Sequence, residues 1–163
     1  MITILFKYFW IAFIIITFVN AFIMRHRSKK YITEMPDLKD GYDKLFKGMI
    51  FYGNIPWVIM GFGIISGLSN NMFDYFNPKS MNSIVLVFHF SIIVLWVLSI
   101  RWIYFKSGAE FIENHPGFIQ VQGFGNRNNI SAKQIKLFYP LMLAVGIAGM
   151  IMMWIMDKPT LKL

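Results

Sequence analysis

Four long stretches of this chain contain no charged residue, and each is long enough to cross a lipid bilayer as a helix. They cover residues 8–24, 48–73, 82–100 and 137–156. An α-helix rises 1.5 Å per residue, so about 20 apolar residues cross the hydrocarbon core. Backbone amides in that core must be hydrogen-bonded within the protein, which favours helices. The sequence therefore predicts an all-α integral membrane protein, a bundle of four transmembrane helices.

The segments between these stretches are too short to form a separate soluble domain. We expect one membrane domain over residues 1–163, with the second span ending near residue 70 and an outer loop at residues 71–81. The other connections are residues 25–47 and 101–136. The first stretch is expected to be a retained span and not a cleaved signal peptide, because basic residues follow it and a small-residue cleavage site does not.

Lys and Arg residues concentrate in two of the three loops. Residues 25–47 carry seven of them and residues 101–136 carry five, whereas the rest of the chain carries four. Loops rich in Lys and Arg remain in the cytoplasm. We therefore predict that both loops are cytoplasmic and that both termini lie on the outer side (N-out/C-out). This orientation also accounts for the net charge of +8, so nucleic acid is not an expected partner.

The first basic loop opens with a cluster that could bind anionic lipid. The cluster consists of Arg25, Arg27, Lys29 and Lys30. Each such charge near an anionic bilayer surface is worth about 1 kcal/mol. The alternative is that the cluster serves only to set the orientation of the first span.

Short amphipathic helical segments are expected in the two cytoplasmic loops. Pro36 suits the first residue of a helix that leads into the second span. Residues 109–114 are expected to form a short helix, and residues 123–129 a flexible connection rich in Gly and Asn. Ser131 and Gln134 have the spacing of a capping box, in which each side chain satisfies a free amide at a helix start. The fourth helix should therefore begin there.

Three polar or kinking residues lie within the first two spans. Pro56 should kink the second span, because proline lacks the amide that would bond one turn earlier. Asn20 and Asn54 lie at depths that allow an interhelical hydrogen bond. These features favour a role in helix packing. The alternative is a broken helix with a polar pocket that binds a solute, as in transporters.

His89 is the one histidine at membrane depth, near the middle of the third span. Its expected role is a neutral imidazole hydrogen-bonded across the bundle, and the alternatives are a proton carrier and a haem ligand. His26 and His115 lie in cytoplasmic segments, so Met150 would have to serve as the second haem ligand. We therefore expect no cofactor and no bound metal, with His89 as a weak candidate for haem.

Small residues predict close helix contacts at two of the spans. Gly63 and Gly67 form a GxxxG pattern in the second span. The fourth span carries a similar set, Ala144, Gly146, Ala148 and Gly149. Small residues let helix backbones approach closely in a bilayer, where van der Waals contact drives association. The methionines of the fourth span are expected to surround the helix as adaptable packing and not to form a metal-binding face, namely Met150, Met152, Met153 and Met156.

Several classes of chemistry are excluded by the residues that the chain lacks. It has no cysteine, which removes thiol catalysis and Cys-ligated metals. No Asp or Glu lies within a span, which argues against proton-coupled export and against carboxylate-bound metals there. The motifs of metalloproteases and serine hydrolases are also absent from the sequence. No catalytic residue is assigned, and an enzyme is not expected.

The expected function is that of an accessory or scaffolding subunit of a larger membrane complex, in contact with lipid and with a protein partner or a second copy. One alternative is a transporter or channel component for a small neutral solute, lined by Asn20, Asn54, Pro56 and His89. The other is a haem-binding membrane subunit. The short loops and the lack of a cleavable leader favour the bacterial inner (cytoplasmic) membrane.

Overall fold

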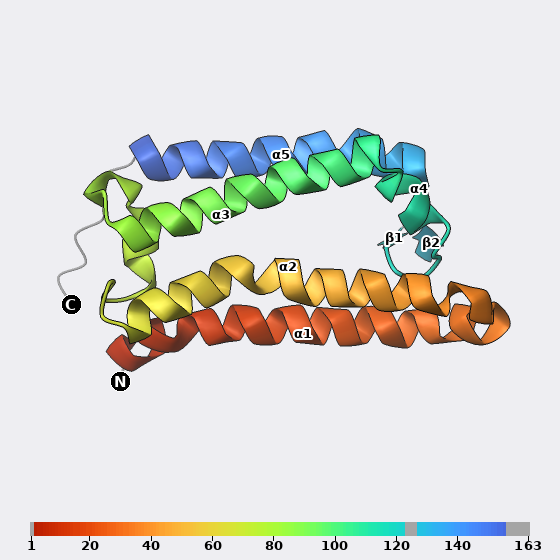
Figure 1. Cartoon of the computed structure of the whole chain (residues 1–163), viewed down its shortest axis with the longest axis horizontal. Helices are drawn as coiled ribbons and strands as arrows, with labels where there is room; N and C mark the ends of the chain where they lie inside the picture. The colour runs from red at the N-terminus through yellow and green to blue at the C-terminus, as the bar shows by residue number, and fades with distance from the viewer. Residues whose placement is uncertain (1, 123–126, 156–163) are drawn as a thin grey trace.

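The computed structural model describes residues 2–122 and 127–155 of the chain. Within them, four long helices dominate (Figure 1), namely α1 (Ile2–Glu34), α2 (Lys39–Ile65), α3 (Ser83–Ile100) and α5 (Ala132–Ile155). Each belongs to a stretch that is long and apolar enough to cross a membrane. The expected all-α architecture, with four helices able to span a membrane, is confirmed. Residues 123–126, and residue 156 at the end of the fourth expected span, lie outside the described residues.

The long helices run side by side along the molecule (Figure 1). α2 packs along α1 on one side and against α3 on the other. α5 lies beside α3, with Gly146 against Trp96 and a hydrogen bond between Tyr139 and Ser99. We call the end with the start of α1 and the last turn of α5 the terminal end. Residues 25–47 and the described parts of the second loop, residues 101–122 and 127–136, reach the opposite end, which we call the charged end.

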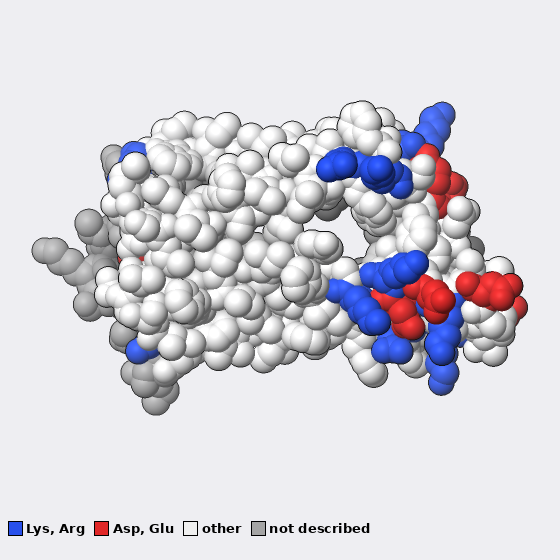
Figure 2. Space-filling model, viewed as in Figure 1, with Lys and Arg blue, Asp and Glu red and all other residues white. Residues whose placement is uncertain are grey.

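Charged side chains are concentrated at the charged end, whereas the rest of the visible surface is almost free of them (Figure 2). Large apolar side chains are exposed on the helices between the two ends, for example Phe22 at 73% and Val145 at 74%. Water would disfavour such a surface, but lipid accommodates it. The two basic loops therefore share one end of a lipid-facing bundle, as the sequence predicts.

The loop between α2 and α3 folds over the terminal end as two short 3₁₀ helices, Met72–Phe76 and Pro78–Ser80. Tyr75 is buried there, and its hydroxyl donates to the Met60 backbone oxygen at 3.1 Å and accepts from Ser69 Oγ at 3.0 Å. Asn82 caps α3 by accepting from the Ile84 amide at 3.0 Å. The loop is thus held against both helices that it joins.

Short elements cover the charged end. A 3₁₀ turn (Pro36–Leu38) leads into α2, so Pro36 begins a helical segment as expected. A π-helical turn (Arg101–Phe105) extends α3 and is followed by α4 (Gly108–Glu113), which matches the short helix expected at residues 109–114 within a residue at each end. A small apolar core joins these elements around Tyr42, Phe46 and Phe118.

Three features of the structure differ from the sequence-based expectation. Residues 127–129, which belong to the flexible connection expected at residues 123–129, form strand β2 (Arg127–Asn129), and this strand pairs antiparallel with β1 (Gln120–Gln122). α2 ends at Ile65 and not near residue 70. Gly67 follows the helix with a φ of 76°, so the GxxxG pattern does not form a face of the helix.

The expected capping box is confirmed, because Ser131 Oγ accepts from the Gln134 amide at 3.2 Å and Gln134 Oε1 accepts from the Ser131 amide at 2.9 Å.

Candidate functional site

His89 is buried in α3, with 4% of its surface exposed, about 9 Å along the helix from Ser83. Its Nε2 lies 2.9 Å from the backbone oxygen of Tyr75. A carbonyl oxygen can only accept a hydrogen bond, so Nε2 carries the proton and Nδ1 of the neutral ring carries a lone pair. Nδ1 is buried and has no hydrogen-bond partner among the described residues. The ring is therefore fixed in one tautomer, with an unused acceptor.

His89 lines a cavity of about 320 Å³ that lies among all four long helices. The cavity wall is apolar and aromatic, and the described part of the chain contributes no charged side chain to it. The loop between α2 and α3, which we call the closing loop, contributes to this wall. The lining residues are Phe13 of α1, Trp57 and Met60 of α2, Met72, Tyr75 and Phe76 of the closing loop, Phe88, His89, Ile92 and Trp96 of α3, and Gly146, Gly149, Met150 and Met153 of α5. The closing loop borders the cavity at the terminal end. Its Tyr75 forms part of the wall, and the backbone oxygen of the same residue forms the hydrogen bond with His89.

The described methionines of α5 face different surroundings. Met150 and Met153 line the cavity together with His89, whereas Met152 is 55% exposed. The haem hypothesis required Met150 near His89, and both residues line the same cavity. Among the described residues, no group of three or more His, Cys, Asp or Glu side chains could hold a metal ion.

The other polar candidates lie away from this cavity. Asn54 is buried, and its amide nitrogen donates to the backbone oxygen of Ile50 at 2.7 Å. Asn20 is exposed, and within residues 2–122 and 127–155 no hydrogen bond joins it to Asn54. Pro56 is buried inside a continuous α2, and Figure 1 shows that this helix is not straight. Of the four residues expected to line a solute site, the structure brings only His89 to the cavity.

The small residues have three kinds of surroundings: side chains of neighbouring elements, the cavity, and the outer surface of α5. A Cβ on Gly63 would meet Tyr75 and Ile84, and a Cβ on Gly146 would lie 2.9 Å from Trp96. Gly149 has open space beside it on the cavity wall. Ala144 and Ala148 are exposed on α5.

Sequence analysis missed the close contact of Gly61 with Trp10, where a Cβ would lie 2.7 Å from the indole ring. The sequence around Gly61 does not indicate this contact, because the indole ring comes from another helix, α1. The Trp10 indole nitrogen and Asn54 Oδ1 are also buried without a partner among the described residues. These unpaired groups are costly in hydrocarbon, so each is a place where a water or ligand would gain a hydrogen bond.

The basic cluster takes part in two ion pairs at the charged end. Arg25 lies 3.8 Å from Asp43, and Lys30 lies 3.8 Å from Glu34. Nearby, the hydrogen bond from Lys136, followed by one from its own backbone amide, lowers the pKa of the Glu110 carboxyl below its usual value. The charged end thus carries acid–base pairs among its described residues.

No family model, no curated protein and no solved structure matches this chain. The function must therefore be argued from the cavity, the buried polar atoms and the lipid-facing surface.

Proposed function

We propose that this protein binds a small, neutral and mostly apolar molecule in the cavity beside His89, and that the molecule enters from the bilayer. This develops the hypothesis of a transporter or channel component for a small neutral solute. The observation that carries the proposal is the unpartnered Nδ1 of a buried histidine that lines a cavity of about 320 Å³. A lone pair in such a place gains a hydrogen bond only from a molecule that enters the cavity.

The size of the cavity favours an organic molecule over one or two waters. An engineered apolar cavity of about 150 Å³ holds benzene, and ligand pockets in proteins begin near 300 Å³. The cavity of about 320 Å³ beside His89 is in this range. A molecule with two fused aromatic rings is therefore of suitable size.

The lining determines the chemistry that such a ligand needs. It should be neutral, since none of the described residues that line the cavity carries a charge. It should donate one hydrogen bond, because Nδ1 of His89 can only accept one in this tautomer. Aromatic rings of Trp57, Phe88 and Trp96 and the thioethers of the cavity methionines favour an aromatic body.

Binding of 1-naphthol and of naphthalene to the protein in mild detergent tests the proposal. The two probes differ by one hydroxyl group, and a net hydrogen bond is worth about 0.5–1.5 kcal/mol, so we expect about a two- to tenfold preference for 1-naphthol. Stabilisation against thermal unfolding at increasing probe concentration gives both affinities. His89→Phe should remove the preference and leave the binding of naphthalene.

A pair of neighbouring methionines supplies the matched control. Met153→Trp should fill the cavity and weaken both probes, whereas Met152→Trp alters an exposed position one residue away and should leave both unchanged. Equal weakening by the two variants, or a preference that persists in His89→Phe, would refute the proposal. A Soret band in the purified protein that His89→Ala removes would instead support the haem-binding hypothesis.

The second candidate function is that of an accessory or scaffolding subunit. The observation that favours it is the exposure of Ala144 and Ala148 on α5, because small residues allow a partner helix to approach closely while lipid does not require them. Purification in a gentle detergent should then retain a partner protein or a second copy. Ala144→Ile with Ala148→Ile should release it, and Val145→Ile on the same helix should not.

The proposed orientation places the charged end in the cytoplasm of a bacterial cell and both termini outside the inner membrane. The Lys and Arg count of the two loops supports it. The chain has no cysteine, so a single cysteine at an exposed position, Lys29 or Ser80, can be labelled by a membrane-impermeant maleimide in intact cells. Labelling of Ser80→Cys alone is expected, and labelling of Lys29→Cys alone would reverse the orientation.

A further inference from the structure

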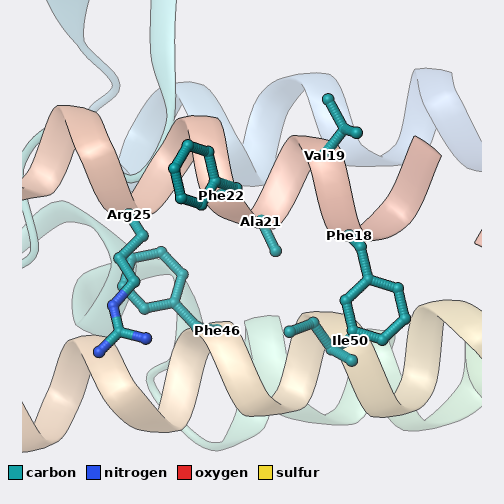
Figure 3. A pocket seen from close by; sticks show the side chains of 7 residues that line it. All are labelled: Phe18, Val19, Ala21, Phe22, Arg25, Phe46 and Ile50. Atoms are coloured by element: carbon teal, nitrogen blue, oxygen red, sulfur yellow. The ribbon is translucent and has the colours of Figure 1, made fainter. Parts of the chain in front are cut away.

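A groove separates α1 and α2 where the two helices approach the charged end (Figure 3). It has a volume of about 420 Å³ and is apolar except for one arginine. Five lining residues come from α1 and two from α2, namely Phe18, Val19, Ala21, Phe22, Arg25, Phe46 and Ile50. We call it the α1–α2 groove. It is independent of the His89 cavity, since the two share no lining residue.

The groove exists because a small residue stands between large ones on α1. Ala21 is buried at its floor, with 4% of its surface exposed. Phe18 and Phe22 on either side are 51% and 73% exposed and form raised walls. Figure 3 shows Phe18, Ala21 and Arg25 pointing from α1 toward α2, with Phe46 pointing back from α2.

Arg25 gives one end of the groove a positive charge at a defined depth. It is the first charged residue after the uncharged stretch of residues 8–24, so it lies where hydrocarbon gives way to head groups. Its side chain is 67% exposed, and its ion pair with Asp43 is 3.8 Å long and solvent-accessible. Such pairs contribute little. The guanidinium is therefore available to a stronger anion, and its planar fork matches a phosphate group.

We infer that the α1–α2 groove binds an anionic phospholipid, with its phosphate on Arg25 and one acyl chain along the groove toward Phe18. Seven residues separate Arg25 from Phe18, which is about 10 Å along the helix. The acyl chain gains no hydrophobic free energy on entering the groove, since it is already surrounded by lipid and not by water. Selectivity must come from the charge on Arg25, and the position of the lipid from close contact with the walls. The excess positive charge at the same end favours an anionic lipid over a zwitterionic one.

Spin-labelled phosphatidylglycerol and spin-labelled phosphatidylcholine, each as a trace component of phosphatidylcholine vesicles that contain the full chain, test the inference. The fraction of motionally restricted label gives the relative affinity of each lipid. We expect about a fivefold preference for phosphatidylglycerol, the size that one charge near anionic lipid supplies. Arg25→Gln should abolish most of it. Arg27→Gln also removes one positive charge, two residues away, but Arg27 does not line the groove, so this variant should retain the preference for phosphatidylglycerol.

A steric variant separates the groove from simple surface charge. Ala21→Leu fills the floor and leaves every charge in place, so the preference should fall as it does in Arg25→Gln. Should Ala21→Leu fail to give monodisperse protein, Ile50→Trp fills the groove from α2. An undiminished preference in the filled variant, or an equal loss in Arg27→Gln, would overturn the inference. Competition by inorganic phosphate would also overturn it, because the site would then take a free anion and not a lipid.

Discussion

Gly63 on α2 lies against the loop that closes the terminal end of the bundle. A Cβ added at residue 63 would lie 2.7 Å from Cγ1 of Ile84 and closer still to the hydroxyl of Tyr75, whereas ordinary contact begins at 3.4 Å. The neighbours would have to retreat by at least about 0.7 Å. We therefore expect Gly63→Ala to displace the Tyr75 ring.

The cost of this displacement follows from what Tyr75 does in its site. The ring is 1% exposed, and its hydroxyl holds one hydrogen bond to the Met60 oxygen and one from Ser69. Each bond has a net worth of about 0.5–1.5 kcal/mol, and overpacking costs about 1–3 kcal/mol. Alanine is a better helix former than glycine by up to about 1 kcal/mol, which offsets part of the loss. The net destabilisation should be about 1–5 kcal/mol.

Equilibrium unfolding in mixed micelles of mild detergent and dodecyl sulfate, followed by far-UV circular dichroism, measures this cost. Gly149→Ala is the matched control, because it makes the same change in a long helix where no atom of residues 2–122 and 127–155 lies within 4 Å of the new Cβ. It should be neutral or slightly stabilising. Tyr75→Phe removes the atom that lies closest to the new Cβ, so the double variant with Gly63→Ala should lose less than the sum of the single losses. Equal stability of Gly63→Ala and Gly149→Ala, or strict additivity, would refute the reasoning.

Three further predictions concern α3, α4 and α5. Gly146→Val should destabilise the fold by about 1–3 kcal/mol in the same assay, because its side chain would meet Trp96 at 2.9 Å or less. Ser131→Ala should cost about 1 kcal/mol and speed amide exchange at Gln134, since the capping hydrogen bond is lost. The pKa of Glu110 is lowered in the folded state, so its contribution is present above the usual carboxyl pKa and is lost as the pH falls through the lowered value. Glu110→Gln should remove that part of the acid dependence of unfolding.

The spanning helices could be predicted because they depend on a strong local signal. An uncharged run of about 20 residues has few ways to satisfy its amides in lipid, and a helix is the simplest. The capping box of Ser131 and Gln134 was equally readable, since both partners lie within one turn. The end of α2 could not be predicted. Residues 65 and 70 both lie in the uncharged stretch of residues 48–73, and only the fold of the closing loop decides between them.

The cavity beside His89 could not be predicted from the sequence. Its wall comes from four helices and a loop, and apolar residues cover these helices all round, so no face identifies itself by periodicity. Met150 and Met153 line the wall and Met152 does not, a distinction that requires the rotation of α5 to be known. The tautomer of His89 likewise depends on the Tyr75 oxygen, which comes from a loop that carries no sequence signal for entering the bundle.

Tyr75 connects the closing loop with the cavity, and this connection gives a last prediction. Its backbone oxygen accepts from His89 Nε2 at 2.9 Å, while its hydroxyl contacts the site that a Cβ on Gly63 would fill. When Gly63→Ala displaces the residue, His89 loses the acceptor that fixes its tautomer, and the ring can turn an N–H toward the cavity. The preference for 1-naphthol over naphthalene should therefore fall in Gly63→Ala, although residue 63 does not line the cavity. Tyr75→Phe keeps the backbone oxygen and should keep the preference. A destabilised Gly63→Ala protein with its full preference intact would show that the loop does not control the histidine.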